Sequence, residues 1–414
     1  MSTAARGGQQ AGVASLSPPF LEVINDQTRS AGGNILGRWK HTSAGSETAL
    51  QLYYDRTFRK DALTGEVLNT LDLDFQHRRA LGSRHDLLWG CGYRLGRDEL
   101  QNSFTLSFDP RQRQDHLLSA FLEDDIALLE DRLRLTLGSK FEHNSFTGYE
   151  VQPNLRLIWT PHLRHAAWLS VARAVRTPSA TEHDMRANLM AFPGPNGLPN
   201  LLSLFGNRGY RSEELLAYEL GYRLQLTPGL FVDLAGFYNF YDHLRSFQAG
   251  VPFLELAPAP PHVVIPGRFE NLIKAQTHGL EVSATWNATS RWRLNAAYSG
   301  LATRFRYPPG DLGNRQIEGD SPGHQVNLRS YLDLTRTIQF DSALYYAGAL
   351  RQLGVPAYAR LDTRLGWHPK PDLELSLVVE NLPNNRHLEF IPEGAVRTTE
   401  MGRSVYGKIT WRFR

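Results

Sequence analysis

The stretch LLAYELGYRLQL, residues 215–226, decides the fold class of this 414-residue chain. Its alternate positions, from Leu216 onward, are leucine or tyrosine, whereas Glu219, Arg223 and Gln225 stand between them. A repeat of two residues is typical of a β-strand, because successive side chains of a strand point to opposite faces. The stretch therefore predicts a strand with one apolar face and one polar face.

The same alternation recurs along the chain, for example at 70–76, 132–142 and 360–368. Alternation alone also fits a soluble β-sandwich, whose outward face is polar. The segments run to about 10–14 residues, however, which exceeds the ~5–6 of ordinary strands and matches the ~9–11 tilted residues that cross a bilayer. Five tryptophans lie near strand ends: Trp159, Trp286, Trp292, Trp367 and Trp411. They resemble the aromatic girdle of a barrel at the membrane interface, and the alternative is that they are core aromatics of a large β protein.

Composition limits the possible classes of protein. The chain is 41% hydrophobic, has a mean hydropathy of −0.38 and lacks an apolar run of the ~20 residues that a membrane-spanning helix needs. This excludes a helical membrane protein but not a barrel, in which only every second strand residue meets lipid. The net charge of +3 comes without a basic block, which excludes nucleic acid as a partner. The single cysteine, Cys91, is interpreted as a small apolar residue on a buried face, and a disulfide within the chain is impossible.

The connections between predicted strands alternate between short and long. Short turns are expected at about 43–46, 81–85, 129–131, 161–164, 227–229, 288–290, 335–337 and 368–371, and long ones at about 57–69, 96–114, 143–149, 174–213, 242–270, 303–322, 347–357 and 383–403. Outer-membrane barrels combine tight periplasmic turns with longer extracellular loops in this way. Residues 101–109 also look strand-like, but a spanning strand there would reverse the order, so we expect an extracellular loop hairpin. The pattern predicts an all-β, antiparallel, up-and-down transmembrane barrel.

The strand count indicates a part of a larger barrel. About seventeen strands are visible, whereas bacterial single-chain barrels have even numbers. The first strand, near 34–42, should run toward the periplasm. Its free backbone edge would need an earlier strand of the chain to pair with. Residues 1–20 also lack an export signal. We therefore expect an N-terminally truncated piece, with 1–32 as a flexible remnant of an extracellular loop and 33–414 as a partial barrel.

Five stretches together carry a family resemblance. They are LRLTLGSKFEHNSFTGYEVQPNLRLIWTP (133–161), WLSVARAVRTPS (168–179), SEELLAYELGYRLQLTPGLFVDLAGFYNFYDHL (212–244), ENLIKAQTHGLEVSATW (270–286) and LSLVVENLPNNRHLEF (375–390). Each is weak alone, but their order and spacing are fairly specific. Over roughly residues 33–414 the sequence resembles the C-terminal barrel portion of TonB-dependent outer-membrane receptors.

The resemblance implies a barrel of about 22 strands around an N-terminal plug, in the outer membrane of a Gram-negative bacterium. Such receptors import scarce, bulky nutrients, and they need no cofactor for it. The ligand would be a ferric siderophore foremost, with haem or cobalamin as further possibilities. The plug, the TonB box and about five strands are then expected to be missing, so the TonB energy-transducing complex would contact only the missing N-terminal region.

The last strand, VYGKITWRF, implies two further partners. Its alternation places Trp411 and Phe413 on one face, which is similar to the signal read by the barrel-assembly machinery, and that face would meet outer-membrane lipid. The family usually ends on the aromatic residue, whereas here Arg414 follows Phe413.

Ligand recognition is expected in the long loops, which are free to vary above a rigid scaffold. The favoured regions are 174–212, then 244–268 and 304–321. Candidate side chains for charge-assisted bonds to an anionic ferric chelate are Arg176, His183, Arg186, Tyr210 and Arg211, and Phe192 or Phe205 would stack on an aryl group. For each residue singly, ordinary loop solvation and packing is the competing interpretation.

The sequence indicates neither catalytic residues nor a metal site. Asp124 and Asp125 sit in a strand whose polar face would line a wet lumen, so solvated charge is favoured over acid–base catalysis. His183 and Asp184 lack the ligand spacing of zinc or calcium motifs. The chain is therefore not expected to be an enzyme.

Two other functions stay open on the sequence alone. A passive porin-like channel of about 16–18 strands would explain a missing plug but not an odd strand count. A soluble all-β hydrolase ranks last, because propeller blades would give short strands repeating every ~40–50 residues. No loop motif separates a siderophore from haem, cobalamin or a sugar.

Overall fold

The computed structural model describes residues 2–311, 319–391 and 398–412. Most of them form one 22-stranded sheet. Its long strands are β1 (Ser2–Ala14), β2 (Leu21–Ser43), β3 (Ser46–Lys60), β4 (Gly65–Leu81), β5 (His85–Gln101), β7 (Gln112–Leu129), β8 (Leu133–Asn144), β9 (Gly148–His162), β10 (His165–Arg176), β13 (Glu213–Thr227), β14 (Leu230–Ala249), β16 (His262–Thr289), β17 (Trp292–Arg306), β18 (His324–Asp333), β19 (Ile338–Ala347), β20 (Tyr358–Lys370), β21 (Leu373–Glu380) and β24 (Ser404–Trp411).

Several short elements lie at one end of this sheet. They are β6 (Leu106–Phe108), α1 (Ala180–Asp184), β11 (Met185–Pro193), the 3-10 turn η1 (Pro195–Gly197), β12 (Pro199–Phe205) and β15 (Phe253–Glu255). β22 (Arg386–His387) and β23 (Met401–Gly402) make a separate pair. Neither helix is long and apolar enough to cross a membrane, within the residues described.

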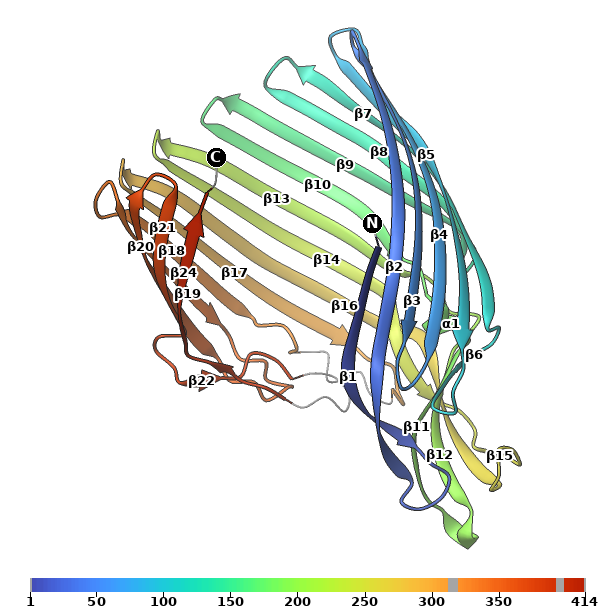
Figure 1. Ribbon diagram of the computed structural model, residues 1–414. Helices are drawn as coiled ribbons and strands as arrows, with labels where there is room; N and C mark the ends of the chain where they lie inside the picture. The colour runs from blue at the N-terminus through green and yellow to red at the C-terminus, as the bar shows by residue number, and fades with distance from the viewer. Residues whose placement is uncertain (1, 312–318, 392–397, 413–414) are drawn as a thin grey trace.

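Each long strand pairs antiparallel with its neighbour in the chain, from β1 with β2 to β21 with β24. The sheet curls into a tall wall around a lumen, with tight turns along the upper rim and the long loops at the lower rim (Figure 1). The pairings of the described residues include none between β24 and the N-terminal strands. The predicted antiparallel barrel architecture is confirmed.

The tight turns lie where the sequence predicts them. All of the expected short connections join neighbouring strands, from Ser43–Ser46 between β2 and β3 to Lys370–Leu373 between β20 and β21. β5 pairs directly with β7, so residues 101–109 do not span the wall, as expected. The expectation that they form a hairpin is wrong: β6 instead pairs with Met185–Ala187 of β11, because the long loop beside it supplies an unpaired edge.

The N-terminal segment differs from the expectation. Residues 1–32 were expected as a flexible loop, but β1 and the first half of β2 form a regular hairpin there, from Ser2 opposite Gly33 to Ala14 opposite Leu21. The expected long connection at 57–69 is likewise mostly strand, because β3 reaches Lys60 and β4 begins at Gly65. Backbone pairing does not need apolar side chains, so strands can continue beyond the apolar band that reveals them in sequence.

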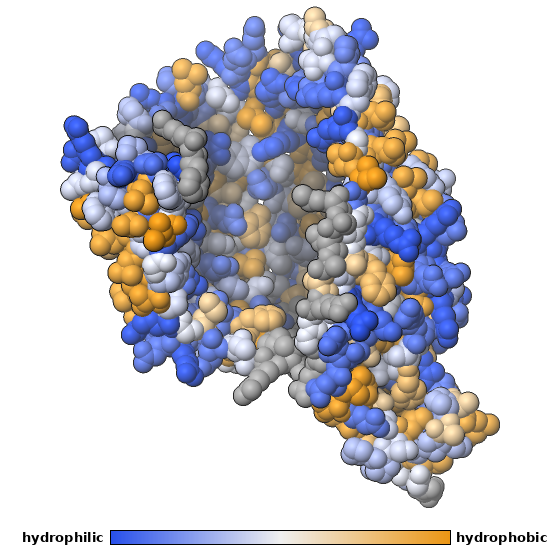
Figure 2. Space-filling view, in the orientation of Figure 1, coloured by the Kyte–Doolittle hydropathy of each residue, from blue (hydrophilic) through white to orange (hydrophobic). Residues whose placement is uncertain are grey.

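The outward face of the wall is apolar and exposed. Leu220 in the middle of β13 is 64% exposed, and Leu169, opposite it on β10, and Leu280, two strands away on β16, are also exposed. Apolar side chains gather along the outer flanks of the wall (Figure 2). Cys91 shares this face between Trp89 and Tyr93 and is exposed, so the expected buried face is instead an outward one. Soluble proteins rarely expose so large an apolar surface, whereas a lipid-facing barrel requires it.

The inward face carries ion pairs between neighbouring strands. Arg94 contacts Asp72 at 2.7 Å, and Arg223 contacts Asp233 at 2.6 Å, each directly opposite its partner in register. Such pairs in a wet lumen add only about 0.2–1 kcal/mol each. The pairs show that the charged face predicted from the alternation is the inward face, which can hold water.

Candidate functional site

The connection between β10 and β13 folds into a structure that we call the loop platform, residues 177–212. β12 pairs in parallel with the start of β16, from Asn200 opposite Val263 to Phe205 opposite Arg268. Leu201 and Val264, opposite each other in register, are completely buried, and Leu201 belongs to an apolar cluster with Ala14, Leu16 and Ala191. The longest predicted loop is therefore a packed element attached to the wall at the loop end of the lumen (Figure 1).

A capping box begins the platform. The Ser179 hydroxyl accepts the backbone N–H of Thr181 at 3.2 Å, and the Glu182 carboxylate accepts the backbone N–H of Ser179 at 3.0 Å. This S-x-x-E arrangement satisfies donors at a helix start and turns Glu182 inward. Burial acts to raise the pKa of Glu182, but the bonds from Ser179 and the charge of Arg176 outweigh it and hold the pKa below its usual range.

Arg176 joins three groups at the edge of the platform. Its Nε lies 2.9 Å and its Nη2 2.6 Å from the two carboxylate oxygens of Glu213, and its Nη1 lies 3.1 Å from Glu182. The hydroxyl of Tyr210, a residue only 2% exposed, donates to Glu213 at 3.1 Å. Burial, followed by the Glu213 charge, raises the pKa of Tyr210. The predicted residues Arg176 and Tyr210 are therefore brought together, but as members of an internal network.

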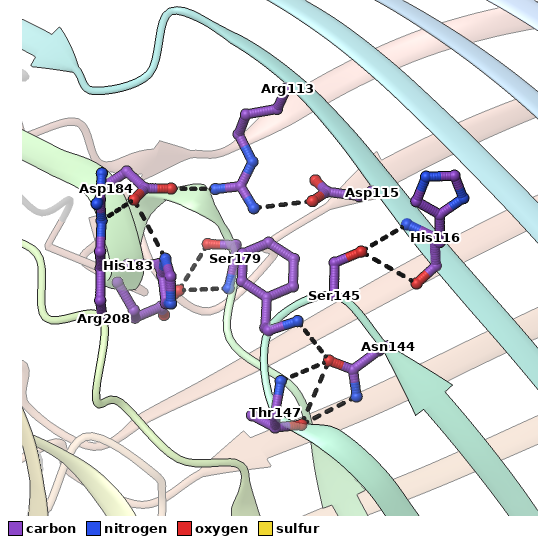
Figure 3. A network of polar contacts seen from close by, with 12 residues as sticks. Arg113, Asp115, His116, Asn144, Ser145, Thr147, Ser179, His183, Asp184 and Arg208 are labelled. Carbon is purple, nitrogen blue, oxygen red and sulfur yellow. Dashed lines mark hydrogen bonds and ion pairs between the residues drawn. The ribbon is translucent and has the colours of Figure 1, made fainter.

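A second network ties the platform to β7. The Asp184 side chain, 4% exposed, forms an ion pair with Arg113 of β7 and accepts from Arg208 and His183 at 3.2 Å each (Figure 3). Arg113 also lies over the ring of Phe146, 4.3 Å from its centroid. His183 is therefore held by Asp184, and its ring meets Phe146 edge-on.

The remaining predicted residues divide between two environments. Arg186 forms a two-pronged pair with Glu255 of β15 at 2.6 and 2.7 Å and lies over the ring of Phe205. Hydrogen bonds from Arg186 lower the pKa of Glu255. Arg211 is exposed, and its backbone N–H and C=O form hydrogen bonds with the side-chain amide of Asn271. Among the five predicted side chains it alone points to solvent without a partner in the part of the chain that is described.

The loop end of the lumen contains a cavity of about 610 Å³. Arg176 and Arg245 supply its cations, and Phe237, Tyr241 and Phe305 supply its aromatic rings. These residues come from β10, β14 and β17, which the curvature of the wall brings around one space. All three regions favoured by sequence contribute to it, since Gly319, Asp320 and Ser321 complete the lining. No group of three or more His, Cys, Asp or Glu side chains suited to a metal ion occurs among the described residues.

Comparison with known families decides the identity of this architecture. The family model for the TonB dependent receptor-like β-barrel matches residues 22–382. The chain belongs to the TonB-dependent receptor β-barrel family. The predicted resemblance is confirmed. The chain is a membrane-spanning β-barrel protein of the Gram-negative outer membrane, and its family consists of transporters rather than enzymes.

Solved and curated receptors resemble this TonB-dependent receptor barrel at low identity. The siderophore receptor PirA of Acinetobacter baumannii superimposes with a TM-score of 0.73 at 16% identity, covering 94% of this chain and 63% of PirA. A variant of the ferric enterobactin receptor of Pseudomonas aeruginosa gives 0.73 at 16%, covering 93% and 62%. The iron-regulated outer membrane virulence protein of Vibrio cholerae is 22% identical over 279 residues, 64% of this chain and 40% of that protein. The chain thus spans less than two thirds of the length of these relatives.

The receptor's terminal strand is only partly described. Trp411 lies on the outward face of β24, 60% exposed, and its indole N–H donates to Asp372 at 3.2 Å. Phe413, the other residue of the predicted assembly signal, lies outside the described residues.

Acidification is expected to loosen the loop platform of this receptor. Because the folded-state pKa of Glu182 is depressed, its stabilisation is present above the ordinary carboxyl pKa near 4.5 and is lost as pH falls through the folded value. Hydrogen exchange of residues 177–212, corrected for intrinsic rates, should stay constant from about pH 7 to 5 and rise at lower pH. Glu182→Gln should flatten this dependence, and an equal rise in that variant would contradict the assignment.

Proposed function

We propose that this chain supplies the wall and the ligand-binding loops of a receptor that imports a ferric siderophore in a TonB-dependent manner. The observation that carries the proposal is the cavity at the loop end of the lumen, which combines two arginines with three aromatic rings. Its volume of about 610 Å³ is within the usual range of small-molecule sites. The relatives named above, a siderophore receptor and a ferric enterobactin receptor, support the same ligand class.

The chemistry of an iron(III) catecholate matches this lining. The complex is anionic and presents aryl rings, so guanidinium groups would donate charge-assisted hydrogen bonds while Tyr241 and Phe305 pack on the rings. Arg176 is already held by Glu213, which leaves it a positioning role. Arg245 lines the cavity, with Nη1 3.9 Å from Glu182 and its guanidinium over the Phe247 ring, and is the cation that we assign to the ligand. Arg211 would attract the anion from the rim.

Two partners complete the proposal. Energy would come from the TonB complex through a part of the receptor outside this sequence. The outward strand β24, with Trp411 on its lipid face, would be read by the barrel-assembly machinery together with Phe413.

Binding of ferric enterobactin to the purified chain tests the ligand assignment. Arg245→Gln is expected to weaken binding by about tenfold or more, since a hydrogen bond to a charged group contributes roughly 1.5–3 kcal/mol. The matched control is Arg268→Gln, which changes an exposed arginine on β16 outside the cavity. Fluorescence titration with the ferric complex and with the iron-free chelator separates ligand binding from nonspecific association. Equal affinities of the wild type and Arg245→Gln for the ferric complex would refute the assignment.

A further inference from the structure

The outward face carries a row of charges at the loop-side end of its apolar band, which we call the outward ionic row. Its members lie on β10, β13, β14, β16 and β17 and are Arg173, Glu214, Asp242, Lys274, Arg304 and Arg306. They line a shallow cavity of about 300 Å³ together with Leu216 and Phe240, two exposed apolar residues next to them on the turn side. The row therefore stands at the depth where a bilayer changes from acyl chains to headgroups.

Cations outnumber carboxylates in this row. Lys274 lies 2.7 Å from Asp242, and Arg173 lies 3.3 Å from Glu214, so both carboxylates already have a partner. Arg304 and Arg306 are exposed, and within the described ranges neither forms an ion pair. Register places Arg306 opposite Lys274 and Arg304 opposite Gln276, on the same face as the outward Leu280. The row thus holds four cations and two carboxylates, and the two cations in excess are Arg304 and Arg306 at its β17 end.

An apolar groove adjoins the row on its turn side, on the same strands. Its volume is about 1010 Å³, and its lining is largely apolar. One row across it reads Leu220, Gly236, Leu280 and Gly300, each opposite the next in register. Gly236 leaves side-chain space on the outward face, because a Cβ added there would meet only the Gly279 carbonyl oxygen, at 3.8 Å. At Gly300 the Tyr298 side chain takes up this space, its hydroxyl 2.9 Å from an added Cβ.

We propose that the outward ionic row and the groove together seat one phosphorylated membrane lipid of the outer leaflet. Charge complementarity selects the headgroup, because guanidinium groups bind phosphate oxygens through paired N–H donors and Lys274 adds a point charge. Because the cations adjoin the groove, the same ligand should also carry an acyl chain, since an outward groove in a bilayer is filled by lipid rather than water. Free phosphate would satisfy the cations but leave the groove without its occupant.

Lipid retention by the purified chain tests this seat. The chain is reconstituted in phosphatidylcholine vesicles containing a minor fraction of phosphatidylglycerol, extracted gently, and weighed by native mass spectrometry. The wild type is expected to retain phosphatidylglycerol over phosphatidylcholine by at least tenfold. The double variant Arg304→Gln/Arg306→Gln should lose this preference, and Gly236→Leu, which fills the groove, should lower retention while keeping all the cations.

Matched controls keep the outcome interpretable. Arg56→Gln/Arg97→Gln removes two exposed arginines that share an outward row on β3 and β5, and Gly37→Leu fills an open outward position on β2. Both should retain lipid as the wild type does, and circular dichroism confirms that each variant is folded. The proposal would be overturned if the wild type retained both lipids equally. It would also be overturned if the control variants lost phosphatidylglycerol as much as the test variants do. Displacement of the lipid by millimolar inorganic phosphate would also overturn it, because the site would then bind phosphate alone.

Discussion

Leu220→Arg is expected to destabilise the folded chain in a bilayer by about 2–4 kcal/mol, because it places a charge on the lipid face near the membrane midplane. Leu220 lies halfway along β13 and is 64% exposed on the outward face. In lipid, the guanidinium would have neither water nor a protein partner. The measurement is a urea titration of the chain refolded into phospholipid vesicles, followed by the shift in gel mobility between folded and heated protein.

The control for this variant changes the other face of the wall at the same height. Ser170 of β10 lies opposite Glu219 in register and points into the lumen, so Ser170→Arg gains an acidic neighbour and stays in water. We expect Ser170→Arg to fold within about 1 kcal/mol of the wild type. Equal destabilisation by both substitutions would mean that the two faces do not differ in solvent.

Asp184→Ala is expected to free the loop platform from the barrel wall, at a local cost of about 3 kcal/mol. Asp184 is the common acceptor for Arg113, Arg208 and His183, and its carboxylate is 4% exposed. Its removal leaves Arg113, itself 9% exposed, with Asp115 as its remaining acidic partner. Hydrogen exchange in residues 177–212 should accelerate by about a hundredfold, while exchange in β3 and β4 stays unchanged.

Asp109 provides a matched carboxylate for this experiment. It stands 3.9 Å from the same Arg208, but its side chain is 97% exposed. Asp109→Ala should leave exchange in the platform unchanged, because an exposed pair contributes little. A platform that exchanges at the wild-type rate in Asp184→Ala would contradict the proposed attachment. In that case the parallel pairing of β12 with β16 would suffice to hold the platform.

The spanning part of the fold could be predicted because lipid imposes alternation on it. Every second residue from Leu216 to Leu226 must be apolar, and the tight turns follow from where this pattern breaks. The hairpin of β1 and β2 was missed because residues 1–32 are rich in small and polar side chains, which carry no such pattern. There the backbone pairs without help from apolar side chains, so the sequence resembles a loop.

The candidate site was predicted less completely. Charged residues of the longest loop were predicted to bind ligand, which stays a prediction, and their ion-pair partners Glu213 and Glu255 are selected by the fold rather than by sequence distance. One local signal was available: Ser179 and Glu182 have the spacing of a capping box, which indicates a helix start and a fixed carboxylate. Arg245 and Phe305 line the same cavity because the wall curves, and no local pattern reveals that.

The central claim is that the outward face of this wall lies in lipid while the inward face lies in water, and the single native cysteine tests it most directly. Cys91 is exposed on the outward face of β5, and the inward Ser119 of β7 lies at the same height, opposite Gly92. In vesicles, a charged, membrane-impermeant maleimide should fail to label Cys91, whereas an apolar maleimide should label it. Ser119→Cys in a Cys91→Ala background should react with the charged reagent. Labelling of Cys91 by the charged maleimide as fast as that of the inward cysteine would contradict the claim.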